Sequence, residues 1–233
     1  MIILALDSTA GTGSVALCRD RKPIATLTLN TGNTHSETLL PSVETALKLS
    51  GMTSDDIDLF ACSKGPGSFT GVRIGAATLK GIAFGKDKPC VGVSTLEALA
   101  YNLRGFSGIA CPVMNARRSQ VYNALFRIEN GAITRLCEDR AISLADLAAE
   151  LEAYGDTPIY LSGDGCDTTK DALSACNLQE TPEELICQSG YSVAMCALAA
   201  YERGEHTTDT ELVPTYLRLP QAERERLEKE QKQ

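Results

Sequence analysis

The sequence has few of the features that mark metal-binding or disulfide-stabilised proteins. Only two histidines are present, His35 and His206, and they lie far apart in the chain. The nine cysteines are scattered and include no Cys-x-x-Cys pair, so neither a zinc site nor a disulfide framework is indicated. We expect these cysteines to be buried or half-buried free thiols, and we predict no metal site.

Long apolar runs and basic clusters are also missing. The N-terminal apolar stretch ends at Asp7, and no window approaches the roughly 18 apolar residues that a membrane span needs. We therefore expect a cytoplasmic protein without membrane contact. The formal net charge is −8 and no Lys/Arg cluster is present, which suits a surface poorly for binding tRNA phosphates. We expect any association with tRNA to be indirect, through another subunit.

Strand and helix patterns alternate along the chain, and the order recurs in its second half. The first half predicts strands at 2–7, 14–18, 24–29, 58–63 and 90–93, with helices at 35–50, 72–84 and 94–103. The second half predicts strands at 109–115, 120–129, 133 onward and 159–161, helices at 143–151 and 191–202, and an extended segment at 212–218. The predicted fold class is α/β, with duplicated lobes at 1–105 and 106–220. A charged tail follows at 221–233, for which a solvated helix or a disordered segment is the simplest interpretation.

The first long helix has clear start and stop signals. Thr34 and Glu37 fit a capping box, and Gly51 fits a helix stop. Pro41 lies within the pattern and predicts a kink or a late start. His35 is interpreted either as a helix-start residue with a local hydrogen bond or as a contact for a partner.

The segment Gly-Pro-Gly-Ser-Phe-Thr-Gly at residues 65–71 is the most specific motif in the chain. It lacks the Lys-Ser/Thr of a Walker loop and the third glycine of a dinucleotide fingerprint. Ser68 or Thr70 is expected to cap the following helix. That helix carries Gly71, Gly75 and Gly81, and each helical glycine costs about 1 kcal/mol relative to alanine. Such glycines indicate a close approach, either by this chain's own first helix or sheet or by a helix of a partner.

Six segments together carry a resemblance to a known family; they span residues 3–9, 35–41, 65–75, 91–96, 116–122 and 216–223. They resemble the TsaB (YeaZ) family of tRNA threonylcarbamoyladenosine biosynthesis proteins. The resemblance implies an actin/hsp70-like (ASKHA) fold of two lobes, no cofactor, and two partners: a paralogous catalytic subunit, TsaD, and an ATPase, TsaE. That assembly transfers a threonylcarbamoyl group from its adenylate to N6 of the adenosine adjoining the anticodon, in tRNAs that read A-starting codons.

The same resemblance indicates that this chain is not itself the catalyst. In the catalytic relatives, two histidines four residues apart on one helix hold iron or zinc, whereas Thr95 and Leu99 stand at the matching positions here. Asn115 replaces the aspartate of the family's Asp-Ala-Arg segment, and an amide attracts a hydrated cation less than a carboxylate does. We therefore assign no catalytic residue.

Two sets of candidate residues follow. The first is an interface on the helices at 35–50 and 70–84, for the catalytic subunit or for a second copy in a homodimer: His35, Glu37, Leu40, Val43, Leu47, Gly71, Arg73, Gly75, Thr78 and Leu79. The second is a vestigial nucleotide cleft: Asp7, Ser8, Thr9, Asn115, Arg117, Gly163 and Gly165. An ATPase or kinase using this cleft is the alternative function. A metallopeptidase is a third, and the missing paired histidines count against it.

Overall fold

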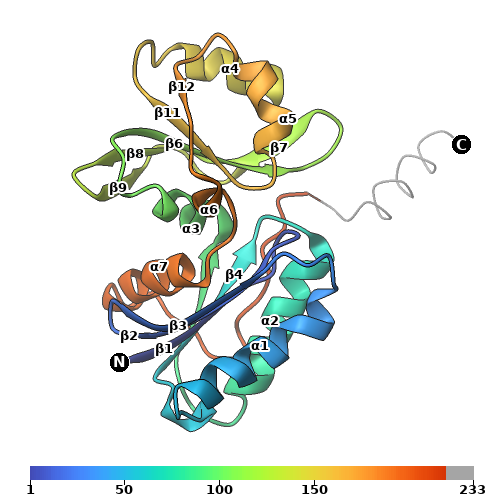
Figure 1. Cartoon of the computed structure of the whole chain (residues 1–233), viewed down its shortest axis with the longest axis vertical. Helices are drawn as coiled ribbons and strands as arrows, with labels where there is room; N and C mark the ends of the chain where they lie inside the picture. The colour runs from blue at the N-terminus through green and yellow to red at the C-terminus, as the bar shows by residue number, and fades with distance from the viewer. Residues whose placement is uncertain (219–233) are drawn as a thin grey trace, which may run out of the picture.

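The structure is a computed structural model that describes residues 1–218, so the predicted tail at 221–233 lies outside the described residues. The chain forms two lobes, each built on a sheet with flanking helices (Figure 1). Within residues 1–218, no helix is both long enough and apolar enough to cross a membrane.

The first sheet has the strand order β3-β2-β1-β4-β5. Strands β1 (Ile2–Asp7), β2 (Gly13–Arg19) and β3 (Lys22–Leu29) form an antiparallel meander, while β4 (Leu59–Gly65) and β5 (Cys90–Ser94) run parallel to β1. The central strand β1 is almost wholly buried, because both faces of the sheet are covered.

Alternate residues of β1 enter two different cores. Leu4 and Leu6 pack beneath α1 (His35–Leu49) and α2 (Phe69–Ala83), whereas Ile3 and Ala5 face α7 (Gly190–Glu202). Figure 1 shows α1 and α2 together on one side of the sheet and α7 on the other. The helix α3 (Thr95–Asn102) packs against α7 and joins the first lobe to the second.

The second sheet has the order β10-β7-β6-β11-β12, with β8 paired to β6 and β9 paired to β8. Its strands are β6 (Gly108–Asn115), β7 (Gln120–Asn123), β8 (Phe126–Glu129), β9 (Ala132–Arg135), β10 (Arg140–Ser143), β11 (Ile159–Ser162) and β12 (Leu178–Gln179). Its helices are α4 (Leu144–Glu152), α5 (Cys166–Lys170) and α6 (Glu183–Ile186). Two short 3-10 helices complete the described elements, Ser54–Asp56 in the first lobe and Asp171–Leu173 in the second.

Three details differ from the sequence predictions. The single strand predicted at 120–129 is two strands, because the buried Asn123 amide donates to Pro112 O (3.0 Å) and Ala124 O (3.1 Å) and interrupts the ladder. The first helix does not start late, since it begins at His35 and continues through Pro41. Strands β10 and β12 and the short helices α5 and α6 were not predicted at all.

The predicted second lobe, residues 106–220, includes a segment that packs on the first lobe. Helix α7 lies within 106–220, yet it packs on the first sheet, where Gly190 approaches Val15 and Ala16 closely. After α7, Thr207 forms an antiparallel bridge with Cys90, and Thr215 N donates to Lys64 O (2.7 Å). The segment 190–217 therefore returns to the first lobe, because α7 is apolar on most of its surface and needs a covered face.

Candidate functional site

The β1–β2 turn of the first lobe is held in place by hydrogen bonds within the turn and to β4 and α2. The Asp7 carboxylate accepts hydrogen bonds from Ser63 Oγ (2.5 Å), Thr9 N (2.9 Å) and Thr9 Oγ1 (2.7 Å). Burial raises the pKa of Asp7, and these hydrogen bonds partly offset that effect. Ser8 Oγ donates to Gly71 O (2.9 Å). The predicted cleft residues Asp7, Ser8 and Thr9 are thus engaged in holding this turn against β4 and α2.

His35 also supports this turn. Its Nε2 lies 2.6 Å from Ala10 O, and its ring lies against Gly13, where an added Cβ would be 3.1 Å from Nδ1. Glu37 completes the predicted capping box with Thr34. Of the two interpretations of His35, a hydrogen bond within this chain is the one that the structure contains.

In the second lobe, Gly163 and Gly165 are required by packing. Gly163 has φ +102°, and an added Cβ would lie 2.2 Å from Val113 O; Gly165 N donates to that same carbonyl (3.0 Å). Asp164 lies between them in the Gly-Asp-Gly segment, but the sequence-based set of cleft residues does not include it. Its Oδ1 accepts from Asn115 N (3.0 Å), and burial raises the pKa of Asp164. Asn115 Oδ1 in turn accepts from Arg117 N (2.8 Å), so Asn115 shapes the β6–β7 turn.

Thr95 and Leu99, which stand where the catalytic relatives have metal-binding histidines, are buried in apolar surroundings. Leu99 packs in a core with Ala10 and Leu96, and Thr95 is fully buried with no hydrogen-bond partner for its hydroxyl. Within residues 1–218, no three His, Cys, Asp or Glu side chains lie close enough to share a metal ion. The chemistry available at these positions is therefore packing rather than ligation.

Helix α2 begins at Phe69, three residues earlier than the predicted start at residue 72. Ser68, one of the two predicted caps, is its N-cap, and its Oγ accepts a hydrogen bond from Gly71 N (3.2 Å). Two glycines of α2 face inward. An added Cβ would lie 2.0 Å from Ser8 O at Gly71 and 2.5 Å from Ser8 Oγ at Gly75, whereas nothing lies within 4 Å at Gly81. Gly71 and Gly75 therefore permit a close approach by this chain's own β1–β2 turn.

The predicted interface residues fall into three groups. Val43, Gly71, Gly75 and Leu79 are buried inside the first lobe, so their assignment to an outer surface was wrong. His35, Leu47 and Thr78 are half-buried, and Glu37, Leu40 and Arg73 are exposed. The error has a simple cause: apolar residues at helical spacing face the core of the same chain.

Arg73 is exposed but not free. Its Nε donates to Tyr216 Oη (2.8 Å), its guanidinium lies 3.8 Å from the Phe69 ring centroid, and Phe69 and Tyr216 have centroids 4.9 Å apart. Lys80 Nζ donates to Thr210 O (3.1 Å) and Leu212 O (3.2 Å). The segment from Thr207 to Leu217 thus lies along α2, and we call it the C-terminal strap.

Three large apolar side chains are exposed on α1 and at the C-terminal end of α2. Leu40 is 45% exposed, Leu49 at the end of α1 is 79% exposed, and Phe84 at the end of α2 is 77% exposed. Ala77 and Gly81 of α2 are also exposed. We call these five residues the α1–α2 face. The predicted interface residues include only Leu40 among these five, and Gly81 was noted only as a helical glycine that indicates a close approach. Leu49 and Phe84 were not named, although each precedes a helix-ending glycine by one or two residues.

Comparisons with known proteins agree with this architecture. A family profile described as "TsaD: tRNA N6-adenosine threonylcarbamoyltransferase" matches residues 30–225. The chain is 34% identical to the tRNA threonylcarbamoyladenosine biosynthesis protein TsaB of Bacillus subtilis, with 96% of each chain covered. It is 29% identical to the Escherichia coli protein of the same name, over 94% of this chain and 95% of that one.

A structural likeness supports the fold independently. YeaZ from Pseudomonas aeruginosa superposes with a TM-score of 0.77 at 24% identity, covering 93% of this chain and 99% of that one. The expected actin-like fold of two lobes is confirmed. The chain belongs to the TsaB family of tRNA threonylcarbamoyladenosine biosynthesis proteins and is related in sequence to the TsaD family.

Proposed function

We propose that this protein is a non-catalytic cytoplasmic subunit in the biosynthesis of tRNA threonylcarbamoyladenosine, and that it binds and activates a TsaD-type transferase. The transferase would move the threonylcarbamoyl group from its adenylate to N6 of the anticodon-adjacent adenosine, with a TsaE-type ATPase as a further partner. The observation that carries the proposal is similarity across 96% of the chain to a protein named for this biosynthesis.

Three features support a binding role rather than a catalytic one. Thr95 and Leu99 supply no metal ligand and are buried. The polar residues of the predicted cleft, above all Asp7, are engaged in hydrogen bonds within the chain. The net charge of −8 disfavours a strong grip on tRNA by this chain alone. The cytoplasmic part of the proposal has separate support, because all nine cysteines are free thiols, as is usual in a reducing compartment.

The α1–α2 face is the surface we assign to the partner. Leu40, Leu49 and Phe84 would give it apolar anchors, and Ala77 and Gly81 would let a partner helix approach the backbone of α2 closely. A second copy of this chain would use the same face, so homodimer and heterodimer would compete.

Reconstitution tests the function directly. The chain alone, and then mixed with TsaD-type and TsaE-type proteins, is assayed for modified adenosine by mass spectrometry of tRNA nucleosides. We expect no product from the chain alone and strong dependence on it in the mixture. ATP turnover or threonylcarbamoyl transfer by the isolated chain would contradict the non-catalytic role.

The surface is tested by Ala77→Arg, because Gly75 is buried and its replacement would disturb the fold. We expect the Ala77→Arg variant to remain folded and to lose co-elution with the TsaD-type subunit. The matched control is Ala149→Arg, an exposed helical alanine on α4 in the second lobe. Equal co-elution of the two variants would exclude the α1–α2 face.

A further inference from the structure

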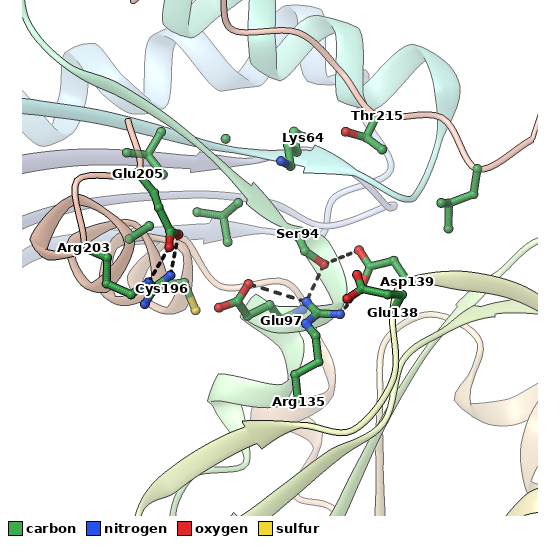
Figure 2. Close-up of a pocket in the computed structure, with 15 residues that line it drawn as sticks. Lys64, Ser94, Glu97, Arg135, Glu138, Asp139, Cys196, Arg203, Glu205 and Thr215 are labelled. Atoms are coloured by element: carbon green, nitrogen blue, oxygen red, sulfur yellow. Dashed lines mark hydrogen bonds and ion pairs between the residues drawn. The ribbon is translucent and has the colours of Figure 1, made fainter. Parts of the chain in front are cut away.

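A groove of about 680 Å³ runs beside the outer edge of β5 and is lined by both lobes (Figure 2). Its floor is the strand from Val91 to Ser94. One wall comes from the end of α7 with Arg203 and Glu205, and another from Lys64 and the C-terminal strap. The second lobe closes it with residues 135–139. This volume lies within the range of small-ligand sites.

The floor of the groove presents unpaired strand backbone. Phe60 N donates to Pro89 O (3.0 Å), so by strand alternation β4 pairs with residues 89, 91 and 93 of the neighbouring strand. Cys90 turns the other way and exchanges two 2.8 Å hydrogen bonds with Thr207. Within residues 1–218 this outer pairing stops at that bridge, which leaves the backbone of Gly92 facing the groove.

Most charges that line the groove neutralise one another. Arg135 pairs with Asp139 (2.6 Å) and Glu97 (3.6 Å), and Arg203 pairs with Glu205 (2.7 Å). Lys64 and Glu138 form no ion pair within residues 1–218, although the Glu138 charge acts on Arg135 and helps to raise the pKa of that guanidinium.

The Lys64 and Glu138 side chains lie on opposite sides of Ser94 in the groove (Figure 2). The Lys64 side chain crosses Gly92, with Cδ 2.9 Å from the position of an added Cβ. Glu138 adjoins Asp139, which accepts a hydrogen bond from Ser94 Oγ (2.5 Å). Figure 2 shows Ser94 between Lys64 on one side and Glu138 on the other.

We propose that this groove binds a short peptide with free termini, two or three residues long. The peptide lies antiparallel to β5, pairs an amide with the Gly92 backbone, and directs its carboxylate to Lys64 and its ammonium group to Glu138. This direction continues the antiparallel pairing that Thr207 begins. The distance from Gly92 to Ser94, two strand residues at roughly 3.3 Å each, matches a peptide of this length.

The test is calorimetric titration of the full chain with trialanine, whose free termini and backbone are the groups the site recognises. We expect binding by the native protein and none of N-acetyl-trialanine amide, which has the same backbone without the charges. Lys64→Met keeps the aliphatic stem and removes the charge, so affinity should fall about tenfold or more. Glu138→Gln should weaken binding in the same way.

The matched control is Lys22→Met, an exposed lysine on β3, which is the edge strand opposite β5 and contributes no residue to the groove lining; this change should leave the affinity unchanged. Far-UV circular dichroism establishes that each variant is folded. Three results would overturn the proposal: no binding of trialanine at millimolar concentration, equal affinity of the capped peptide, or equal effects of Lys64→Met and Lys22→Met.

Discussion

Helix α2 offers the same substitution in two opposite surroundings, at Gly71 and at Gly81. At Gly81 nothing lies within 4 Å of an added Cβ, so Gly81→Ala should only remove the cost of a helical glycine. That gain is up to about 1 kcal/mol. At Gly71 the added Cβ would lie 2.0 Å from Ser8 O, a contact that no folded protein tolerates without a backbone shift.

The cost at Gly71 can be estimated from the contacts that the shift breaks. Moving the β1–β2 turn away from α2 overpacks the site, which typically costs about 1–3 kcal/mol. It also strains the Ser8 Oγ–Gly71 O hydrogen bond (2.9 Å), worth about 0.5–1.5 kcal/mol. Gly71→Ala should therefore lose about 1.5–4.5 kcal/mol, opposite in sign to Gly81→Ala.

Urea unfolding followed by far-UV circular dichroism measures both variants against the native protein. Each midpoint is converted to a free energy with its own slope, since a changed slope would indicate a changed unfolded state. A Gly71→Ala variant as stable as the native protein would refute the close packing of Ser8 against α2. Equal destabilisation of both variants would show that helix position, and not the turn, sets the cost.

Two further predictions concern the C-terminal strap and the buried carboxylate. Tyr216→Phe keeps the ring against Phe69 but removes the 2.8 Å bond from Arg73, so it should cost about 0.5–1.5 kcal/mol in urea unfolding, and Tyr216→Ala should cost more; no loss in either would argue against a docked strap. Asp7 has a pKa raised by burial, so its contribution to stability is fully present below its unfolded pKa and is lost as pH rises through the native value. Carbon-detected NMR titration of the Asp7 carboxyl should give a midpoint above 3.8, and a midpoint below 3.8 would contradict the burial.

The sequence predicts the elements of the first lobe well because their local signals agree with their final surroundings. The capping box at Thr34, the Ser68 cap and the strand alternation around β1 are all local chemistry, and the structure contains them. The second lobe was predicted less well. The interruption between β7 and β8 depends on the hydrogen bond that the Asn123 amide donates to Pro112 O, and Pro112 lies on a different strand, β6. No local pattern carries that information.

In the candidate site, too, features set by local sequence were predictable and features set by tertiary contacts were not. Apolar spacing identifies the inward side of a helix, which is why Val43 and Leu79 were mistaken for contact residues. Leu49 and Phe84 lie at helix ends, where periodicity gives no direction. The return of residues 207–217 to α2 is a tertiary event without a sequence period, so the pairing of Arg73 with Tyr216 could not be predicted.

The β1–β2 turn, which contains the predicted cleft residues, packs directly against α1 and α2, the helices that carry the α1–α2 face. Ser8 fills the space left by Gly71 and Gly75, and His35 at the start of α1 holds Ala10 of the same turn. Asp7 and Thr9 fix the turn in place from within the lobe. In a phosphate-binding cleft, Asp7, Ser8 and Thr9 would contact the ligand. Here they instead hold the turn against the two helices whose outer face we assign to the partner. A change in the turn should disturb partner binding even though none of its side chains belongs to that face.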